Sequence, residues 1–465
     1  MIRIDFCGAV GEVTGSGYLV QTDAATVLVD FGAFQGGPGA RERSRELGPV
    51  RPDRLDAVVL SHAHIDHSGR LPLLMAAGYA GQLHATPATL DLAALLLADQ
   101  GRILEGDLVR ENRRRQRAGQ PRLEPPFTLA DVERVKASGR PLAYGQRRQI
   151  APGISLRLGE AGHILGSASV ELCIADGGTS RVLVFSGDIG PCGAPILRDP
   201  QRPALADLVV MESTYGDRER PSAASTVQRL REILHEAVRN RARVVIPAFA
   251  VGRTQLLLFH MAAAIREAGL PSIPVYLDSP MATAATLVYM HHQELYDAEL
   301  GELVHSGQLR HDLQMLKVAE SVAESRALNE HEGPCVIISA AGMCEAGRVV
   351  HHLRHTLWRE NAHVILSGYM APGTLGRALA DGAGMVEIFG EEIAVRATVH
   401  HLSGFSAHAG QAELLDWLSE VAPQAPRIVL THGDDPARHA LCERIRERYG
   451  LPAECPQPGE TLLLG

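Results

Sequence analysis

The stretch HAHIDHSG at residues 62–69 decides how the rest of this sequence is interpreted. It follows the apolar run AVVLS at residues 57–61, which has the composition of a short buried β-strand. The stretch holds four side chains of the metal-ligand type, namely His62, His64, Asp66 and His67. Four ligands this close together would crowd one tetrahedral ion, but they can divide between two neighbouring ions. Imidazole and carboxylate donors without a thiolate suit zinc best, and manganese less well.

Further candidate ligands lie at the ends of other predicted strands. His163 follows SLRLGEAG, Asp188 ends RVLVFSGD, and His432 lies in RIVLTHGD. Each residue alone is typical of a turn or a cap, so the hypothesis depends on their combination with residues 62–69. A carboxylate that bridges two cations compensates charge on both, and Asp188 is the candidate for that position. The alternative interpretation of the histidines is a solvated surface cluster.

Composition excludes several classes of protein. The chain has 465 residues, of which 45% are hydrophobic and 21% are charged, so it is neither a disordered protein nor a fibre. No stretch approaches the roughly 18 apolar residues of a membrane-spanning helix. Arg3 and Asp5 stand where a secretory signal would be apolar. We therefore expect a cytoplasmic protein with no membrane partner.

Cysteine and charge patterns narrow the classes further. The seven cysteines include no CxxC pair, which argues against a disulfide framework and against a zinc knuckle. The formal charge of −9 has the wrong sign for nucleic-acid binding through bulk charge, so a polyanion would need local attraction.

The expected pattern of secondary structure changes twice along the chain. Residues 1–208 read as short β runs separated by glycine-rich turns, whereas residues 209–390 alternate apolar strands with helices. Buried strands that alternate with helices predict a parallel sheet covered on both faces. Residues 391–465 return to short β runs. We therefore predict that residues 209–390 are inserted into a domain made of the two flanking segments.

One long helix is predicted near residues 88–117 within the first segment. Its last part, RENRRRQR at residues 110–117, is strongly basic. A solvated helix end and an RNA-facing patch both explain this run.

Further motifs occur downstream in a characteristic order, namely ESTYGDR at 212–218, PAFAVGRTQ at 247–255, DSPMA at 278–282, GTLGR at 373–377 and GFSAHAG at 404–410. With HAHIDH, and with Asp30 upstream of it, they make the sequence resemble the metallo-β-lactamase superfamily. Within it the sequence is similar to the β-CASP nucleases, the group that includes the endonuclease subunit of the cleavage and polyadenylation specificity factor. The resemblance covers nearly the whole chain. It implies an α/β fold, an αββα sandwich with an inserted α/β β-CASP domain.

The resemblance also implies roles for individual residues. One zinc ion would be held by His62, His64 and His163. A second would be held by Asp66, His67 and His432, and Asp188 would bridge the two. Asp30 would support the site by orienting a ligand histidine.

His408, in GFSAHAG, matches the second β-CASP motif and is the expected general acid, and Glu212, from the first motif, would raise its proton affinity. Asp66 belongs to the expected catalytic set as well as to the metal ligands. His400 and His401 compete for the role of His408, but neighbouring side chains of a strand point to opposite faces, so at least one of them has another role.

Expected substrate contacts lie in the inserted segment. SAAGMCEAGR at 339–348 runs from a strand into a turn and a helix, so Ser339, Gly342 and Met343 are candidates for phosphate binding. The chain has Ala341 where many family members have serine or proline. Arg253 either contacts phosphate or forms an interdomain ion pair.

The expected activity is hydrolysis of phosphodiester bonds in single-stranded RNA, with internal cleavage, 5′ exonuclease action or both. His432 stands where family members that act on RNA carry histidine, so RNA is favoured over DNA. Three alternatives remain: a small-molecule hydrolase with the same metal core, an inactive RNA-binding scaffold, and a DNA nuclease. A homodimer or an association with RNA-processing factors is also open.

Overall fold

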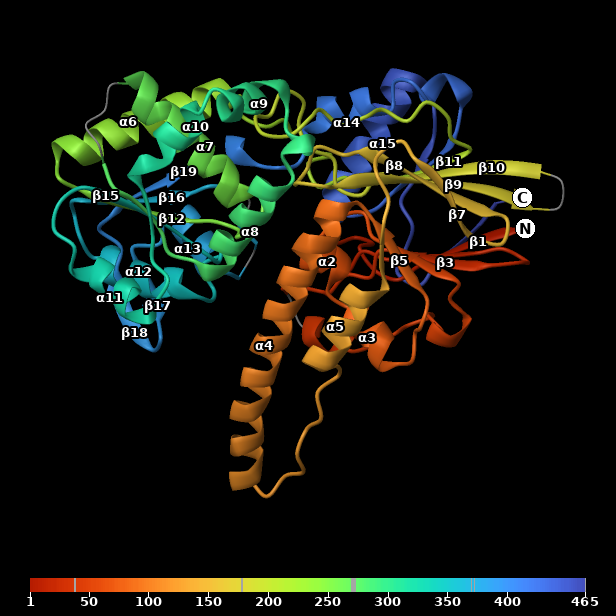
Figure 1. Cartoon of the computed structure of the whole chain (residues 1–465), viewed down its shortest axis with the longest axis horizontal. Coiled ribbons are helices and arrows are strands. Elements are labelled where there is room, and N and C mark those ends of the chain that lie inside the picture. Colours follow the sequence, from red (N-terminus) through yellow and green to blue (C-terminus); the bar gives the residue numbers. More distant parts are fainter. Residues whose placement is uncertain (37–38, 177–178, 269–272, 369, 372, 465) are drawn as a thin grey trace. The chain divides into compact units, whose positions relative to one another are not determined.

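Two compact units make up the chain in this computed structural model, which describes residues 1–36, 39–176, 179–268, 273–368, 370–371 and 373–464 (Figure 1). The first unit consists of Met1–Cys192, Asp199–Glu219 and His408–Gly465, and the second of Gly193–Arg198 and Arg220–Ala407. The chain therefore enters the second unit twice, briefly at Gly193–Arg198 and again at Arg220–Ala407, and returns to the first unit each time. The predicted domain limits at residues 209 and 390 remain predictions.

Two sheets form the centre of the first unit, each with seven strands among the described residues. The order in one sheet is β22 (Thr461–Leu464), β1 (Ile2–Phe6), β2 (Tyr18–Gln21), β3 (Thr26–Val29), β4 (Ala57–Val59), β5 (Gln82–Ala85) and β6 (Gly139–Pro141). The order in the other is β21 (Ala453–Glu454), β20 (Arg427–Leu430), β11 (Leu208–Met211), β10 (Thr179–Phe185), β9 (Ala168–Asp176), β8 (Ile154–Glu160) and β7 (Arg147–Ala151). Both sheets are mixed, because β3 to β6 pair in parallel and so do β10, β11, β20 and β21.

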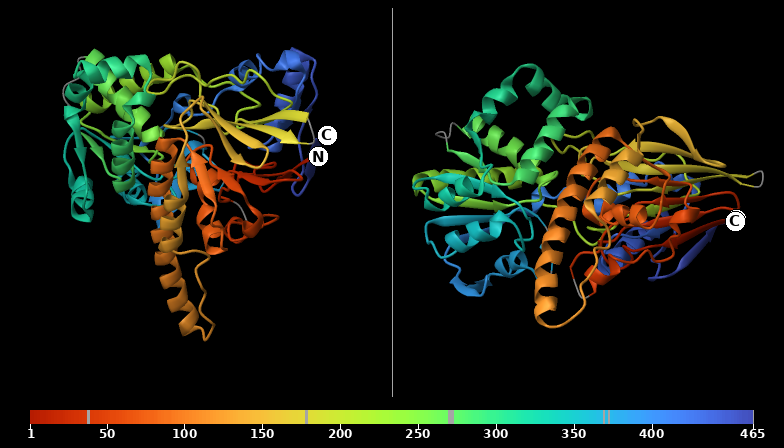
Figure 2. Two further views of the ribbon diagram at one scale, coloured as in Figure 1. Left: turned by 45° about the vertical axis from the view of Figure 1, so that its right-hand side comes forward. Right: turned by 60° about the horizontal axis from the view of Figure 1, so that its bottom comes forward.

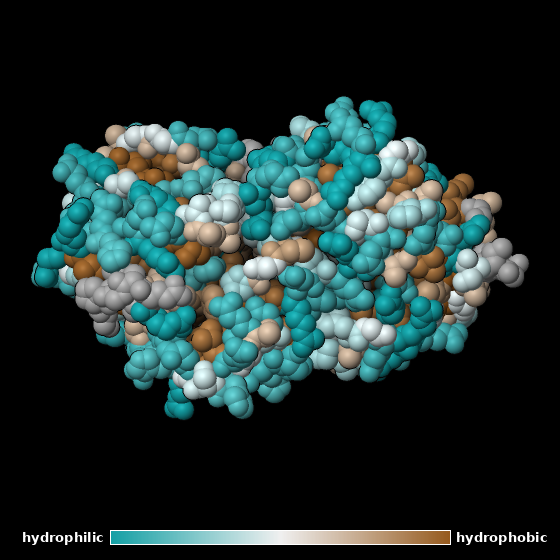
Figure 3. All heavy atoms as spheres, turned by 90° about the horizontal axis from the view of Figure 1, so that it is seen from above, coloured by the Kyte–Doolittle hydropathy of each residue, from teal (hydrophilic) through white to brown (hydrophobic). Residues whose placement is uncertain are grey.

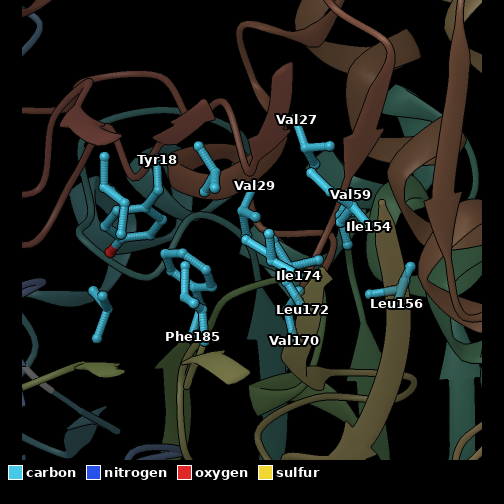
Figure 4. Packing of buried hydrophobic residues seen from close by; sticks show 14 of the residues in the cluster. Tyr18, Val27, Val29, Val59, Ile154, Leu156, Val170, Leu172, Ile174 and Phe185 are labelled. Carbon is cyan, nitrogen blue, oxygen red and sulfur yellow. The ribbon is translucent and has the colours of Figure 1, made fainter. Parts of the chain in front are cut away.

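Apolar side chains from both sheets fill the space between them (Figure 4). In β8, buried positions alternate with half-buried ones, as expected for a strand with one face on a core. Val29 from β3 and Leu172 from β9 are completely buried in this cluster. The ring of Tyr18 lies 5.2 Å from that of Phe185, which joins the two sheets near the carboxyl end of β10.

Helices cover the outer faces of this sandwich. On the second sheet, α14 (Gln411–Trp417) and α15 (Asp435–Tyr449) pack Trp417 and Leu441 against the outward side chains of β11 and β20. Near the first sheet, α4 (Pro87–Arg117) contacts β6 and α5 (Leu129–Ser138) contacts β5. The remaining short helices of this unit are α1 (Ala40–Arg43), α2 (Ile65–Ser68) and α3 (Leu71–Ala76). The order helix, sheet, sheet, helix is the predicted αββα sandwich.

The second unit contains a sheet in which every strand pair is parallel, with six strands among the described residues. Its order is β14 (Leu316–Val318), β13 (Val275–Leu277), β15 (Cys335–Ser339), β12 (Arg243–Pro247), β16 (Ala362–Leu366) and β19 (Thr398–His401). Val244 and Ile246 of β12 pack against α6 (Ala223–Arg239) and α7 (Arg253–Ala268), whereas Val245 packs on the opposite face with α12 (Arg348–Thr356) and α13 (Leu375–Ala380). The predicted parallel sheet with helices on both faces is confirmed.

Smaller elements complete the second unit. They are α8 (Pro280–His291), α9 (Ala298–His305), α10 (Gln308–Asp312), α11 (Val322–Glu330) and the hairpin of β17 (Met385–Ile388) and β18 (Glu391–Ala394). Single 3-10 turns lie at Pro52–Arg54, Gln293–Leu295, Leu313–Met315, Ser403–Phe405 and Ala422–Gln424. The helix α12 begins only at Arg348, because the preceding Gly347 has a φ of 78° and a ψ of −169°, outside the helical region.

Because most apolar side chains are buried in the cores of the two units, few of them are expected on the surface. The face in Figure 3 is mostly hydrophilic, and its hydrophobic residues form small separate patches. Among the described residues, no helix combines the length and the apolar character that crossing a membrane would require.

The contact between the sheets predicts a large stability effect at Phe185, which is 1% exposed. Phe185→Ala should lower the free energy of unfolding by about 3–5 kcal/mol, because it leaves a cavity in the core. Leu205→Ala, at a position 55% exposed, should change it by less than about 0.5 kcal/mol. Urea unfolding followed by circular dichroism measures both, and equal unfolding midpoints for the two variants would contradict this account of the core.

Candidate metal centre

The predicted metal ligands all lie in the first unit, in loops after the carboxyl ends of strands or on the short helix α2. His62 follows β4, Asp188 follows β10, and His432 follows β20. Because β10, β11 and β20 pair in parallel, their following loops emerge at one edge of the sheet. Asp66 and His67 lie on α2, directly after the His62 loop, and His163 follows β8.

One cluster, called here the first cluster, consists of His62, His64, His163 and Asp188. A ligand atom from each residue lies within 4.8 Å of one from every other. The three imidazole rings are mutually 5.0 Å apart between centroids. Asp188 Oδ2 lies 3.5 Å from the Nε2 atoms of both His62 and His163. This is the predicted set for one ion, together with the predicted bridging carboxylate.

The second cluster consists of Asp66, His67 and His432, again with ligand atoms within 4.8 Å of one another. The Nε2 atoms of His67 and His432 are 3.2 Å apart, and His432 Nε2 is 3.5 Å from Asp66 Oδ2. The other oxygen of Asp188, Oδ1, lies 3.2 Å from His67 Nε2 and 3.5 Å from His432 Nδ1. The two oxygens of Asp188 therefore face different clusters.

Two observations support metal ions as the missing partners of these side chains. Two ligands about 2.1 Å from a shared tetrahedral ion lie about 3.4 Å apart, close to the separations of 3.1–3.5 Å between ligand atoms here. In addition, His62 Nε2 and Asp188 Oδ1 are buried and have no hydrogen-bond partner among the described residues. Buried polar atoms without partners are costly, and a cation in the first cluster would satisfy His62 Nε2 while a cation in the second would satisfy Asp188 Oδ1. Oxygen and nitrogen donors without thiolate fit zinc.

Burial and neighbouring charges set the protonation of the ligands. Burial lowers the pKa of His62 and His64, so both imidazoles are neutral near pH 7. Burial would raise the pKa of the Asp188 carboxyl, but His432 and His67 outweigh it and hold this pKa well below the ordinary value. The pKa of Asp66 is lowered to about 2, because its hydrogen bond to His432 and the charges of the neighbouring histidines outweigh burial. Neutral His62 and His64 and ionised Asp66 and Asp188 are in the forms that bind metal. Burial would lower the pKa of His67, but Asp188 and Asp30 outweigh burial and raise this pKa, so binding of a metal there would release a proton.

Asp30 supports the centre from behind the second cluster. Its Oδ2 accepts a hydrogen bond of 2.7 Å from His67 Nδ1, which leaves His67 Nε2 directed at the cluster. Ser61 donates to both Asp30 oxygens, from its backbone N–H and from its hydroxyl, at 2.7 Å each. The Ser61 hydroxyl also lies 3.1 Å from His62 Nδ1. Ser61 was absent from the predicted site, although it directly precedes the first histidine of the motif.

Thr214 is a second support that sequence reasoning missed. Its hydroxyl lies 3.2 Å from His432 Nδ1, and its backbone N–H donates to Glu212 Oε2 at 3.3 Å. It lies in the ESTYGDR string, so its only sequence signal was its position two residues after Glu212.

His408 and Glu212 border the first cluster. His408 Nδ1 lies 3.3 Å from Glu212 Oε1 and 4.0 Å from Asp188 Oδ2, and the His408 ring is 4.6 Å from that of His163. Glu212 is buried, and its Oε1 also accepts from the backbone N–H of Ile189 at 2.6 Å. The His408 side chain is 21% exposed, so it lies between the buried first cluster and the solvent.

The carboxylates also change the acidity of His408. Burial lowers the pKa of its imidazole, but the charge of Glu212 and the hydrogen bond to it, with smaller effects of Asp188 and Asp66, outweigh burial and raise this pKa to about 8. His408 is thus protonated at neutral pH, as a general acid must be.

His400 and His401, the competitors for this role, lie in the second unit on β19. His400 is buried and contacts His363, with His400 Nε2 3.0 Å from His363 Nδ1. His401 is exposed, and its Nε2 donates to the Gly368 carbonyl oxygen at 2.8 Å. The two side chains have different environments, as the alternation along a strand predicts.

The four predicted substrate-binding residues also lie in the second unit. Ser339 is buried and donates its hydroxyl to the Asp278 carbonyl oxygen at 2.8 Å, and Arg253 is buried and donates to the carbonyl oxygen of Ser367. Gly342 is buried, and the sulfur of half-buried Met343 lies 3.4 Å from the Ala371 nitrogen. Their part in binding substrate remains a prediction.

Comparison with known families gives three matches along the chain. Residues 10–248 match the metallo-beta-lactamase superfamily, residues 254–379 a Beta-Casp domain, and residues 392–456 a Zn-dependent metallo-hydrolase RNA specificity domain. A protein of unknown function from Enterococcus faecalis V583 has a solved structure that matches with a TM-score of 0.55 at 15% identity, covering 100% of both chains, which shows the fold alone.

Similar proteins have been named in bacteria and archaea. Ribonuclease TTHA0252 of Thermus thermophilus is 39% identical over 95% of this chain and 95% of its own length. Transcription termination factor FttA of Pyrococcus horikoshii is 33% identical over 100% of this chain and 71% of its own length. On these matches, together with the geometry above, the chain belongs to the β-CASP group of the metallo-β-lactamase superfamily.

Proposed function

We propose that this chain is a zinc-dependent ribonuclease that hydrolyses phosphodiester bonds of single-stranded RNA. The observation that carries the proposal is the position of Asp188, whose two oxygens face two separate groups of metal ligands. A Zn-dependent RNA specificity domain and a relative named as a ribonuclease support RNA as the substrate. A metal-dependent hydrolase agrees with the family.

The first cluster would hold one zinc ion, the second would hold another, and Asp188 would contact both. When bound, two such ions supply an activated water at neutral pH and withdraw charge from the phosphate oxygens. Asp30 holds His67 in the required orientation through its hydrogen bond, and Thr214 does the same for His432. Manganese is the alternative ion for this donor set.

The residues of the chain would supply the proton that the reaction needs. The departing ribose oxygen is a poor leaving group as an alkoxide, so protonation assists bond breaking. His408 carries a proton at neutral pH and lies next to the first cluster. Glu212 contacts Nδ1, so His408 would donate from Nε2, with Glu212 stabilising the imidazolium before transfer.

The alternatives from the sequence receive less support. An inactive scaffold would have no need for seven ligand-type side chains, with Asp188 between two groups of three. A DNA nuclease is disfavoured by His432, which stands where family members that act on RNA carry histidine. The balance between internal and 5′ cleavage, a homodimer or other RNA-processing partners, and the cytoplasmic location all remain predictions.

Replacement of the general acid gives a first test. His408→Ala should reduce cleavage of internally labelled single-stranded RNA by about 10²–10⁴-fold, because an unassisted leaving oxygen must depart as the alkoxide. Metal content, measured by inductively coupled plasma mass spectrometry, should stay at the wild-type value. His401→Ala, which removes an exposed histidine, is the matched control and should leave the rate unchanged. Full activity of a fully metallated His408→Ala protein would contradict the assignment.

The pH dependence gives a second test. His408 acts in its protonated form, so activity should be constant near neutral pH and fall as pH rises through about 8, approaching tenfold for each further unit. Glu212→Gln removes the charge that raises the pKa, so the falling limb should move to lower pH. Single-turnover rates between pH 6 and 10 measure the fall in activity with pH for the wild type and for Glu212→Gln. A limb that does not move in Glu212→Gln would argue against this pair as the proton source.

Metal affinity gives a third test. Asp30→Asn keeps the size of the side chain but weakens acceptance of the His67 proton, so zinc affinity should fall by about 10–100-fold. Competition with a chromophoric chelator measures the affinity. Asp23→Asn, at an exposed carboxylate, is the control. If the two variants bind zinc equally well, Asp30 does not support the centre.

A further inference from the structure

We propose that residues 110–122, called here the basic arm, bind the phosphate backbone of RNA at the distal end of α4, about 35–45 Å along the helix axis from its first residue, Pro87. The arm consists of the last two turns of α4 and the loop that returns toward α5. This inference rests on the proposed ribonuclease function and extends it. It assigns to the chain a second contact with long RNA.

The first turn of α4 is hydrogen-bonded to the loop that carries His163. Thr86 caps the helix by accepting a hydrogen bond from the Thr89 nitrogen at 3.2 Å. The hydroxyls of Thr86 and Thr89 both donate to the Gly166 carbonyl oxygen, at 2.7 and 2.8 Å. Gly166 lies three residues after His163 in the same loop. The helix therefore begins beside a residue of the first cluster and points outward from there.

The distal half of α4 extends beyond the body of the first unit. Buried residues concentrate in the first half of the helix, from Ala88 to Gly101, and only Leu108 is buried in the second half. Figure 1 and the left view of Figure 2 show this half, with the returning loop beside it, extending below the other elements of the first unit. At 1.5 Å per residue, Arg113 lies about 39 Å along the axis from Pro87.

The arm is an ordered hairpin. The Asn112 side chain accepts a hydrogen bond from the Leu123 nitrogen at 2.8 Å and donates to the Leu123 carbonyl oxygen at 3.0 Å. Arg115 Nε donates to the Pro121 carbonyl oxygen at 2.7 Å. These bonds fasten the returning loop along the helix, so the exposed charges are held on a formed surface.

Positive charge concentrates on this hairpin. Residues 110–122 contain six arginines and one glutamate, in a chain whose formal charge is −9. Four of the arginines are exposed and form no ion pair within the part of the chain that the structure describes, namely Arg113, Arg114, Arg117 and Arg122. Arg110 pairs with Asp107.

Helix stability alone does not account for these residues. The helix dipole favours cations in the last turn, which covers Arg114, Arg115 and Arg117 but leaves Arg113 and Arg122 unexplained. Arg113 and Arg117 are like charges four residues apart, which destabilises a helix. A bound polyanion would remove this repulsion.

The composition of the arm also indicates the kind of contact. Guanidinium groups bind phosphate oxygens in pairs of hydrogen bonds. Residues 110–122 include no aromatic side chain on which a base could stack. The arm should therefore bind the backbone without regard to sequence, with a strong dependence on salt. At about 3.4 Å per nucleotide of stacked strand, the length of α4 from Pro87 to Arg113 corresponds to about eleven nucleotides.

A binding experiment tests the arm directly. The triple variant Arg113→Gln/Arg114→Gln/Arg117→Gln keeps good helix-forming residues. The control Arg41→Gln/Arg54→Gln/Arg446→Gln removes the same charge from scattered exposed positions. Both are made with His408→Ala in the full-length zinc-loaded protein, so that a fluorescein-labelled 30-nucleotide RNA stays intact during anisotropy titrations. The arm variant should bind roughly 10–100-fold more weakly at 0.1 M salt, and its salt slope should fall by about 2.

A cleavage experiment separates the arm from the active site. With His408 restored, the arm variant should lose kcat/KM on the 30-nucleotide RNA by a similar factor and keep it on a five-nucleotide RNA, which is too short to reach the arm. Equal binding and equal salt slopes in the arm variant and the control would overturn the inference. So would an equal loss on both RNAs, which would indicate damage to the metal centre.

Two further outcomes are distinguishable from these. If RNA binding is unchanged and only polyglutamate binding weakens in the arm variant, the arm contacts an acidic protein and the inference is wrong. If the wild type cleaves no RNA, the proposed function fails, while the anisotropy titrations still decide whether the arm binds RNA.

Discussion

The carboxylate of Asp188 is the constraint on which the rest of the first unit depends. A buried carboxylate that faces four imidazoles is stable only if surrounding charges compensate it, and both of its oxygens must be held in place. Three parallel strands, β10, β11 and β20, bring Asp188, Glu212 and His432 to one edge of a sheet. The core between the sheets holds this edge close to the segment after β4 in the other sheet. That segment carries His62, His64 and His67.

The backbone bears part of the cost of this arrangement. Asp30 and His432 adopt positive φ values of 56° and 48°, which are uncommon for residues other than glycine. Such conformations cost of the order of 1–3 kcal/mol each and persist only where surrounding contacts hold them. The Asp30 carboxylate has three such contacts from Ser61 and His67, and His432 has Thr214 and Asp66. Both strained residues thus lie where a side chain must be aimed at the centre.

Local spacing made part of this centre predictable. The four ligand-type residues within positions 62–67 stand out by their close spacing, and the long helix was expected near residues 88–117, where the structure has α4, Pro87–Arg117. His163, Asp188 and His432 have no such spacing, and they entered the prediction through strand ends and the family resemblance. Ser61 and Thr214 could not be found, because a hydroxyl beside a histidine has no pattern of its own and matters only once Asp30 and His432 are placed in space. The alternatives for Arg253 were likewise open, since its hydrogen bond to Ser367 joins residues 114 positions apart.

The segmented course of the first unit has a consequence for biosynthesis. Asp188 and His432 belong to the same centre, yet residues 189–431, most of them in the second unit, separate them along the chain. At a translation rate of about 5–20 residues per second, roughly 12–50 s pass between the synthesis of these two side chains. During that interval the nascent chain carries the first cluster without the last histidine of the second. The proposed metal centre can therefore be completed only after the whole second unit has been made, so the order of synthesis itself delays the gathering of all its ligand side chains.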